Sequence, residues 1–214
     1  MDEEISIINS SSRNEKIKNF FVKNKKYIIS ILSLVILIIL FYFAYDAMQE
    51  RKTKSLSEKY NNIVVKFSTS DDQIFKKELI EIINKKNETY SPLALYFIID
   101  NEIKSSNEEI NKFFDIIIND VRLDKEIKNL IIYKKGLFNS DFENENNLIN
   151  ILNPIINSNS IWKSHALYLM AEYFFYKNEK QKAKEFYNQI INFKKSNEEI
   201  IKETQKRLNR DFSE

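Results

Sequence analysis

The feature that most constrains this chain is an uncharged stretch from Tyr27 to Tyr45, which lies between Lys26 and Asp46. As a helix rising about 1.5 Å per residue it covers roughly 28 Å, close to the hydrocarbon thickness of a bilayer. A helix also satisfies its own backbone hydrogen bonds, which a single segment in lipid must do. Tyr27, Tyr42 and Tyr45 lie near its ends, where aromatic belts form at membrane interfaces. We therefore predict a transmembrane helix in contact with the lipid bilayer, with these three tyrosines as its anchors.

Two other kinds of segment resemble such a helix. A buried core helix normally carries a polar stripe, whereas this stretch offers only Ser30 and Ser33. A cleaved signal peptide has a shorter apolar region followed by a small-x-small cleavage site. The exit sequence at 43–48, Phe-Ala-Tyr-Asp-Ala-Met, offers no good site of that kind. The residues therefore favour an uncleaved span.

Flanking charge predicts the orientation of the span. The fifteen residues before it carry six basic side chains and the fifteen after it carry four. Because basic residues are retained on the cytoplasmic side, this difference favours a cytoplasmic N-terminus. The stub at 1–26 can also lie on anionic headgroups, with Phe20, Phe21 and Val22 at the interface. The rest of the chain would then face away from the cytoplasm.

The remainder of the chain is electrically neutral. Removing the six basic and four acidic residues of 1–26 from the 33 and 31 of the whole chain leaves 27 of each. A neutral domain lacks the electrostatic footprint of a nucleic-acid-binding protein. The chain has no cysteine, so it has neither a disulfide framework nor a thiolate site.

Apolar spacing beyond the span predicts helices throughout. The exit helix carries an apolar face, and Ser68–Asp71 is expected to end it and to cap a helix that buries one side. Ser91 and Pro92 predict the N-cap and first position of a helix to about Ile103. A further helix is expected after Ser106, where an apolar stripe recurs at helical spacing, and later ones at about 123–137, up to Pro154, 161–176, 178–193 and 196–209. The stripe after Ser106 is Ile110, Phe113, Phe114 and Ile117. The two apolar faces comprise Leu56, Tyr60, Ile63, Val64 and Phe67, and then Ile74, Phe75, Leu79, Ile82 and Ile83.

Three of these helix starts carry capping signals. Ser106 and Ser196 are each followed three residues later by glutamate, the pattern of a capping box. Ser160 is the expected N-cap of the helix from Ile161 to Tyr176. Asn178, followed by Gln181, marks the start of the next helix.

Helices of this length joined by short polar turns are typical of an α-hairpin array. Leu93, Leu130 and Leu167 are spaced 37 residues apart, each early in the first helix of an expected pair. The third pair matches tetratricopeptide spacing best, with small residues where two helices cross and aromatic residues between them. We therefore predict an all-α fold: a single N-terminal transmembrane helix followed by a tetratricopeptide-like α-hairpin solenoid. The matching residues of the third pair are Ala171, Phe174, Asn178, Ala183 and Tyr187.

Reactive residues are too sparse to predict an enzyme. His165 is the only histidine, so neither a histidine metal cluster nor a catalytic triad can be built around it. Gly136 is the only glycine, whereas phosphate-cradling loops need several. Acidic pairs such as Glu108-Glu109 fall in first helical turns, where they favour the helix dipole. We expect no catalytic residue, no metal, no cofactor and no small-molecule substrate.

A protein-binding groove is the functional alternative that the residues support. In tetratricopeptide arrays the first helix of each pair lines a concave face, and a mixed aromatic and charged groove suits peptide binding. The competing interpretation is that several of these side chains pack against a neighbouring helix. The candidate groove residues are Lys128, Ile131, Lys135 and Phe138 in the second pair and His165, Tyr168, Glu172, Phe175 and Tyr176 in the third.

Four short sequences accompany the basic stub and the span. They are Tyr60-Asn61, Thr89-Tyr90 with Leu93-Ala94, the run from Ile161 to Ala166, and Asn178 with Ala183. The order and spacing of these features resemble the YfgM-like family, the ancillary subunit of the bacterial Sec translocon, over nearly the whole chain. The missing repeat glycines and many alanines depart from the family pattern.

The resemblance implies a non-enzymatic inner-membrane protein with a periplasmic domain. Its implied partners are Sec translocon channel subunits and periplasmic chaperones, so it would assist newly exported proteins. A structural adaptor for division or outer-membrane assembly is the alternative, because a fold does not fix its partner. The expected organisation is a cytoplasmic stub at 1–26, the span at 27–45, an exit helix and linker at 46–70, and the helical domain at 71–214.

Overall fold

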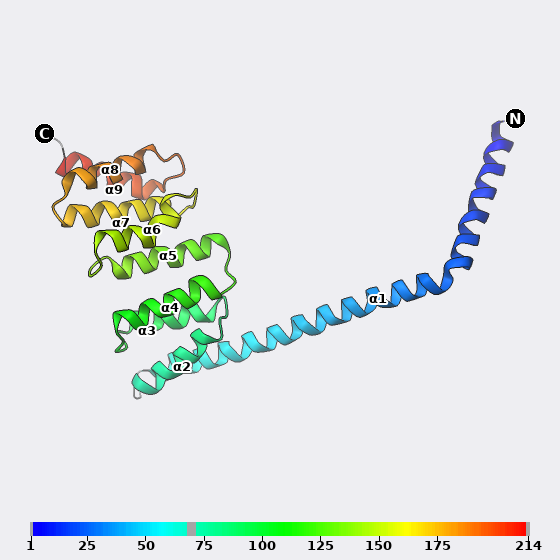
Figure 1. Ribbon diagram of the computed structural model, residues 1–214, viewed down its shortest axis with the longest axis horizontal. Helices are drawn as coiled ribbons and strands as arrows, with labels where there is room; N and C mark the ends of the chain where they lie inside the picture. Colours follow the sequence, from blue (N-terminus) through cyan, green and yellow to red (C-terminus); the bar gives the residue numbers. More distant parts are fainter. Residues whose placement is uncertain (1, 68–71, 213–214) are drawn as a thin grey trace. The chain divides into compact units, whose positions relative to one another are not determined.

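A computed structural model describes residues 2–67 and 72–212, and all regular secondary structure in these ranges is α-helical (Figure 1). The all-α prediction is therefore confirmed. The chain divides into two compact units between Ser55 and Leu56, which are described separately. Its helices are α1 (Asp2–Lys66), α2 (Asp72–Asn84), α3 (Tyr90–Asp100), α4 (Asn107–Asp120), α5 (Lys125–Asn139), α6 (Glu145–Ile156), α7 (Lys163–Tyr176), α8 (Lys180–Asn192) and α9 (Glu198–Asp211).

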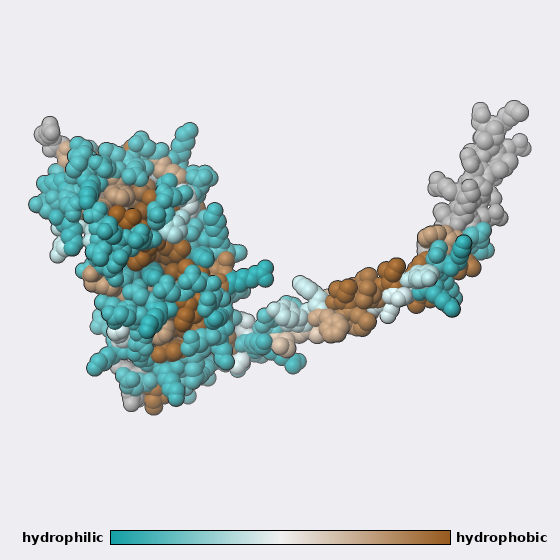
Figure 2. Space-filling model, viewed as in Figure 1, coloured by the Kyte–Doolittle hydropathy of each residue, from teal (hydrophilic) through white to brown (hydrophobic). Residues whose placement is uncertain are grey.

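The first unit is the N-terminal part of α1, which continues unbroken through the predicted boundaries at 26 and 45. Its apolar stretch exposes one large side chain after another, visible as the brown band on this helix in Figure 2. None of the most apolar window of that stretch is buried. One helix near the N-terminus is therefore long and apolar enough to span a membrane. The predicted anchors Tyr27, Tyr42 and Tyr45 are all exposed on it.

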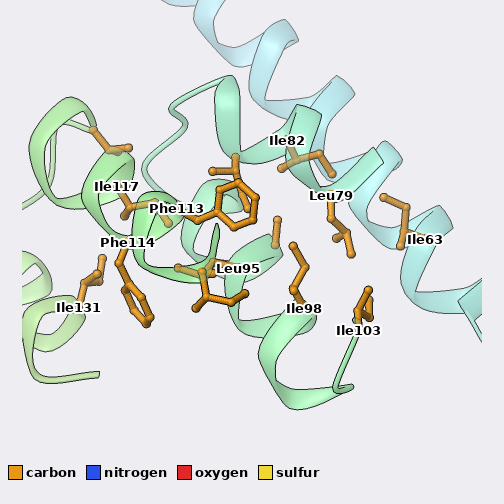
Figure 3. Packing of buried hydrophobic residues seen from close by; sticks show 14 of the residues in the cluster. Ile63, Leu79, Ile82, Leu95, Ile98, Ile103, Phe113, Phe114, Ile117 and Ile131 are labelled. Carbon is orange, nitrogen blue, oxygen red and sulfur yellow. The ribbon is translucent and has the colours of Figure 1, made fainter. Parts of the chain in front are cut away.

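The second unit begins with a hydrophobic core formed by the end of α1 and by α2, α3 and α4. Ile63 of α1 is buried and lies beside Leu79 and Ile82 of α2 (Figure 3). The centroid of the Phe67 ring lies 5.0 Å from that of Phe97 in α3, in an edge-to-face arrangement. The predicted packing of the exit helix onto the domain is therefore confirmed.

Two residues assigned to these apolar faces are exposed. Val64 follows the buried Ile63 and is exposed on α1, and Ile74 of α2 is 60% exposed. Both predictions were wrong because a neighbouring position on a helix is turned by about 100° from the buried one. The buried side of α2 is instead defined by Phe75, Leu79, Ile82 and Ile83.

A second core joins α5, α6, α7, α8 and α9. Helix α7 packs most closely on α8, where Ala171 and Ala183 are fully buried and Phe174 and Tyr187 fill the space between the helices. The sequence correctly predicted this third pair. Asn178 adopts a left-handed φ of 64° after α7, a conformation that asparagine tolerates better than most residues.

The 37-residue spacing does not describe the first pair. Helix α3 packs more extensively on the preceding α2 than on α4. Leu93 is 38% exposed, whereas Leu167 at the equivalent position is fully buried. The spacing failed here because leucine and isoleucine are frequent enough to coincide with any period of this length.

One of the two predicted serine caps is confirmed and the other is shifted by one residue. Ser106 is the N-cap of α4, because its hydroxyl accepts a hydrogen bond from the amide of Glu109 at 3.2 Å. The cap of α9 is Asn197 rather than Ser196, whose hydroxyl instead donates to the carbonyl of Ile190. The sequence alone did not distinguish Ser196 from Asn197 as the cap, since serine and asparagine are about equally favourable N-cap residues.

The starts of α3 and α7 were also predicted imperfectly. Helix α3 begins at Tyr90, and the hydroxyl of Ser91 donates to the carbonyl of Ile82 rather than capping the helix. Helix α7 begins at Lys163, three residues after Ser160. The hydroxyl of Ser160 donates a hydrogen bond to the carboxylate of Glu126 in α5 at 2.6 Å. The predicted break at Ser68–Asp71 lies outside the described residues, as does the side chain of Phe21.

Candidate protein-binding surfaces

Three of the five candidate residues of α7 pack against α8 or α9. Glu172 is ion-paired with Arg207 of α9 and also accepts a hydrogen bond from the Tyr187 hydroxyl at 2.6 Å. The Arg207 guanidinium lies 5.2 Å from the centroid of the Phe175 ring. The Tyr168 ring packs edge-on against Tyr187 at 5.9 Å. Three of the predicted groove residues are therefore engaged by packing within the domain.

The chemistry of this contact is that of a helix interface. Burial, followed by the hydrogen bond to Glu172, raises the pKa of Tyr187 well above its ordinary value. A phenol held neutral next to a carboxylate paired with arginine stabilises the contact and carries no reactive charge. Tyr176 is the exception in this set, since it is 89% exposed on the last turn of α7.

His165 lies in an aromatic cluster between α5 and α7. Its ring centroid is 5.8 Å from that of Tyr133 and 5.1 Å from that of Trp162. Burial lowers the pKa of His165, so the imidazole is neutral near pH 7. Its Nδ1 atom is buried and has no hydrogen-bond partner among the described residues. The histidine thus acts as part of the packing between the two helices.

The candidate residues of α5 face α4 instead. Lys135 is ion-paired with Asp115 of α4 at 2.7 Å, and the Phe138 ring lies 6.0 Å from Phe114. Ile131 is only 1% exposed within the first core, so its assignment to a binding groove was wrong. Lys128 remains partly exposed on the same side of the helix.

The two predicted sets therefore do not come together as one surface. The α5 set lies against α4, whereas most of the α7 set lies against α8 or α9. Helices α5 and α7 meet at Tyr133 of α5, whose ring stacks on Trp162, the residue before α7, at 6.0 Å and lies 5.8 Å from His165. The register was misjudged because the same 37-residue offset was applied to both helices, although their neighbours differ.

A groove that the sequence did not indicate lies between α4, α5 and α6. It has a volume of about 560 Å³ and is open to solvent. Its lining is rich in carboxamides and charged groups, which also abound elsewhere in the chain, so no local pattern marked it. The lining residues are Asn107, Glu108, Asn111, Lys112, Asp115, Lys135, Asn139, Phe142, Glu143, Asn147, Asn150 and Ile151.

Metal ligands are not grouped in the described part of the chain, where no three His, Cys, Asp or Glu side chains are placed to hold an ion. Comparisons of the chain with models of protein families, with curated proteins and with solved structures found no match.

Proposed function

We propose that this chain is a membrane-anchored, non-enzymatic module that binds other proteins. The observation that carries the proposal is the pairing of one exposed apolar helix of membrane-spanning length with an all-helical domain. An apolar surface of that length is unfavourable in water and favourable in lipid, so α1 would act as the anchor. The domain would then be held at the membrane surface.

The chemistry of the domain supports binding rather than catalysis. Burial and a hydrogen bond to Glu172 raise the pKa of Tyr187, but this tyrosine lies in the contact between α7, α8 and α9 and not in an open cleft. Its single histidine packs against two aromatic rings. The open groove between α4, α5 and α6 presents carboxamides and carboxylates, groups suited to a polypeptide.

The partners that we propose come from the resemblance to the YfgM-like family. They are channel subunits of the Sec translocon and periplasmic chaperones, with the helical domain on the periplasmic side of a bacterial inner membrane. The fold within the domain would be a degenerate tetratricopeptide-like solenoid, supported mainly by the α7–α8 pair. A structural adaptor in a division or outer-membrane assembly complex is the second candidate, since the same anchor and domain would serve it.

The topology of the proposal is tested by proteolysis. Membranes carrying the full chain are first washed with alkaline carbonate, which removes peripheral proteins but should leave this chain in the pellet. In intact spheroplasts, added protease should then degrade the domain beyond residue 56 and leave the span protected. A carbonate-soluble chain would contradict anchoring by α1. A domain that is protected in intact spheroplasts and cleaved only after lysis would contradict the translocon proposal.

A further inference from the structure

The floor of the groove between α4, α5 and α6 is a reciprocal pair of carboxamides. Asn111 Nδ2 donates to Asn139 Oδ1 at 2.9 Å, and Asn139 Nδ2 donates to Asn111 Oδ1 at 2.8 Å. Asn139 is fully buried, so the pair has a fixed position at the base of the groove. The pair ties α4 to α5 where Lys135 also meets Asp115.

The pair offers the groove a hydrogen-bond acceptor and no spare donor. Each amide nitrogen uses its second N–H on a backbone carbonyl, Asn111 on Asn107 at 3.0 Å and Asn139 on Lys135 at 2.7 Å. Asn139 is closed off from solvent, whereas Asn111 is only partly buried, and its Oδ1 keeps a second lone pair beyond the bond within the pair. A molecule that meets this floor at Asn111 must therefore donate a hydrogen bond.

The charges around the groove also favour a donor that is cationic. Asp115 and Lys135 neutralise each other, while Glu108 and Lys112 lie one helical turn apart on α4. Glu143 is the remaining charge: Asn147 donates to its Oε2 at 2.7 Å, and it has no cationic partner among the described residues. The lining thus carries one more carboxylate than ammonium group.

An exposed aromatic ring adjoins this carboxylate. Phe142, next to Glu143 in the chain, is 43% exposed, and its ring is held edge-on against Phe138 at 5.3 Å. An aromatic face beside a carboxylate suits a lysine or arginine, whose alkyl stem packs on the ring while its charged end meets the carboxylate. A backbone N–H of the same segment would donate to the carboxamide oxygen of Asn111, the partly exposed member of the pair.

We propose that the groove between α4, α5 and α6 binds an extended polypeptide segment that carries a lysine or arginine, with Glu143 and Phe142 holding the basic side chain. This inference rests on the proposed protein-binding function and adds the surface and the chemistry of the partner. It replaces the α5–α7 face predicted from sequence as the binding surface.

The test uses the full chain in neutral detergent and fluorescent peptides read by anisotropy. One unstructured peptide carries a central Lys-Arg pair, and a matched peptide carries glutamine at both positions. The basic peptide should bind more tightly, and Glu143→Gln and Phe142→Ala should each weaken it about three- to tenfold. The control variants, Glu185→Gln and Ile191→Ala, change an exposed glutamate and an exposed hydrophobic side chain outside the groove and should bind as the wild type does.

Three results would overturn the inference: equal binding of both peptides, equal loss in the control variants, or competition by spermidine at the same charge concentration as the peptide. The last result would make the groove a site for small cations. Photo-crosslinking in cells separates the inference from the proposed function. Crosslinks to protein from position 150 in the groove would support both. Crosslinks to protein from position 176 alone would overturn the groove as the binding surface and leave the proposed function standing. The absence of crosslinks from every exposed position tested would contradict both proposals.

Discussion

Replacing Gly136 with alanine should destabilise the domain. The only glycine of the chain lies where α5 crosses α6, and a Cβ there would fall 2.4 Å from Cδ2 of Leu152 and 2.9 Å from its Cγ. Leu152 is fully buried, so its side chain has little room to move. Overpacking of this kind costs about 1–3 kcal/mol, and alanine returns about 1 kcal/mol through helix propensity. We expect a net loss of up to about 2 kcal/mol of unfolding free energy.

The effect of Gly136→Ala on the unfolding free energy should change sign in a protein that already carries Leu152→Ala. Leu152→Ala alone should cost about 2–5 kcal/mol, because it leaves a cavity at the crossing. In that background Gly136→Ala should stabilise the domain, since the new methyl group meets open space and the helix-propensity gain remains. The coupling between the two positions should therefore exceed about 1 kcal/mol.

The assay is urea unfolding of the full chain in detergent, followed by the fluorescence of Trp162, the only tryptophan. Trp162 packs against the same core as α5 and α6, so it reports on this crossing. The reasoning would be refuted if Gly136→Ala stabilised the wild-type protein, or if it changed the unfolding free energy by the same amount in both backgrounds.

Three further expectations follow from particular side chains. Burial holds the pKa of His165 below its ordinary value of 6.5, so the unfolded chain binds a proton there more readily than the folded chain does. The unfolding free energy should therefore fall as the pH drops below about 6.5. His165→Gln should flatten that dependence in urea titrations between pH 5 and 7; an unchanged slope would show that other groups cause it. Ser106→Ala should cost about 1 kcal/mol by removing the α4 cap, whereas Ser106→Asp should retain most of the stability. Ile36→Arg should oppose membrane insertion by about 2.5–3.5 kcal/mol and shift the chain into the carbonate-soluble fraction, unlike Ile36→Leu.

Much of the fold could be predicted from local patterns. Helix positions followed from apolar spacing, as at Ile110, Phe113, Phe114 and Ile117 of α4, which are all buried. The pair α7–α8 was recognisable because small residues mark a close helix crossing. The first pair was mispredicted because the choice of α2 rather than α4 as the partner of α3 depends on packing between helices, which no periodicity within one helix records.

The candidate site was harder to predict than the fold. Which face of α5 or α7 is free depends on the neighbouring helices, and α9 occupies the face of α7 through Arg207 and Phe212. The sequence did not indicate the groove at Asn111 and Asn139, because these residues are 28 positions apart in a chain rich in asparagine. Their reciprocal hydrogen bonds exist only once α4 and α5 are packed.

The most direct test of the central claim is a native pull-down of the full chain from membranes in mild detergent, with mass spectrometry of every protein retained. A variant lacking residues 56–214 but keeping the span serves as the control for proximity in the membrane. We expect Sec channel subunits or periplasmic chaperones to be retained by the full chain and lost from the control. Retention of division or outer-membrane assembly components would select the adaptor function instead. If the full chain retained no protein beyond those held by the control, the claim that this domain binds proteins at the membrane would be contradicted.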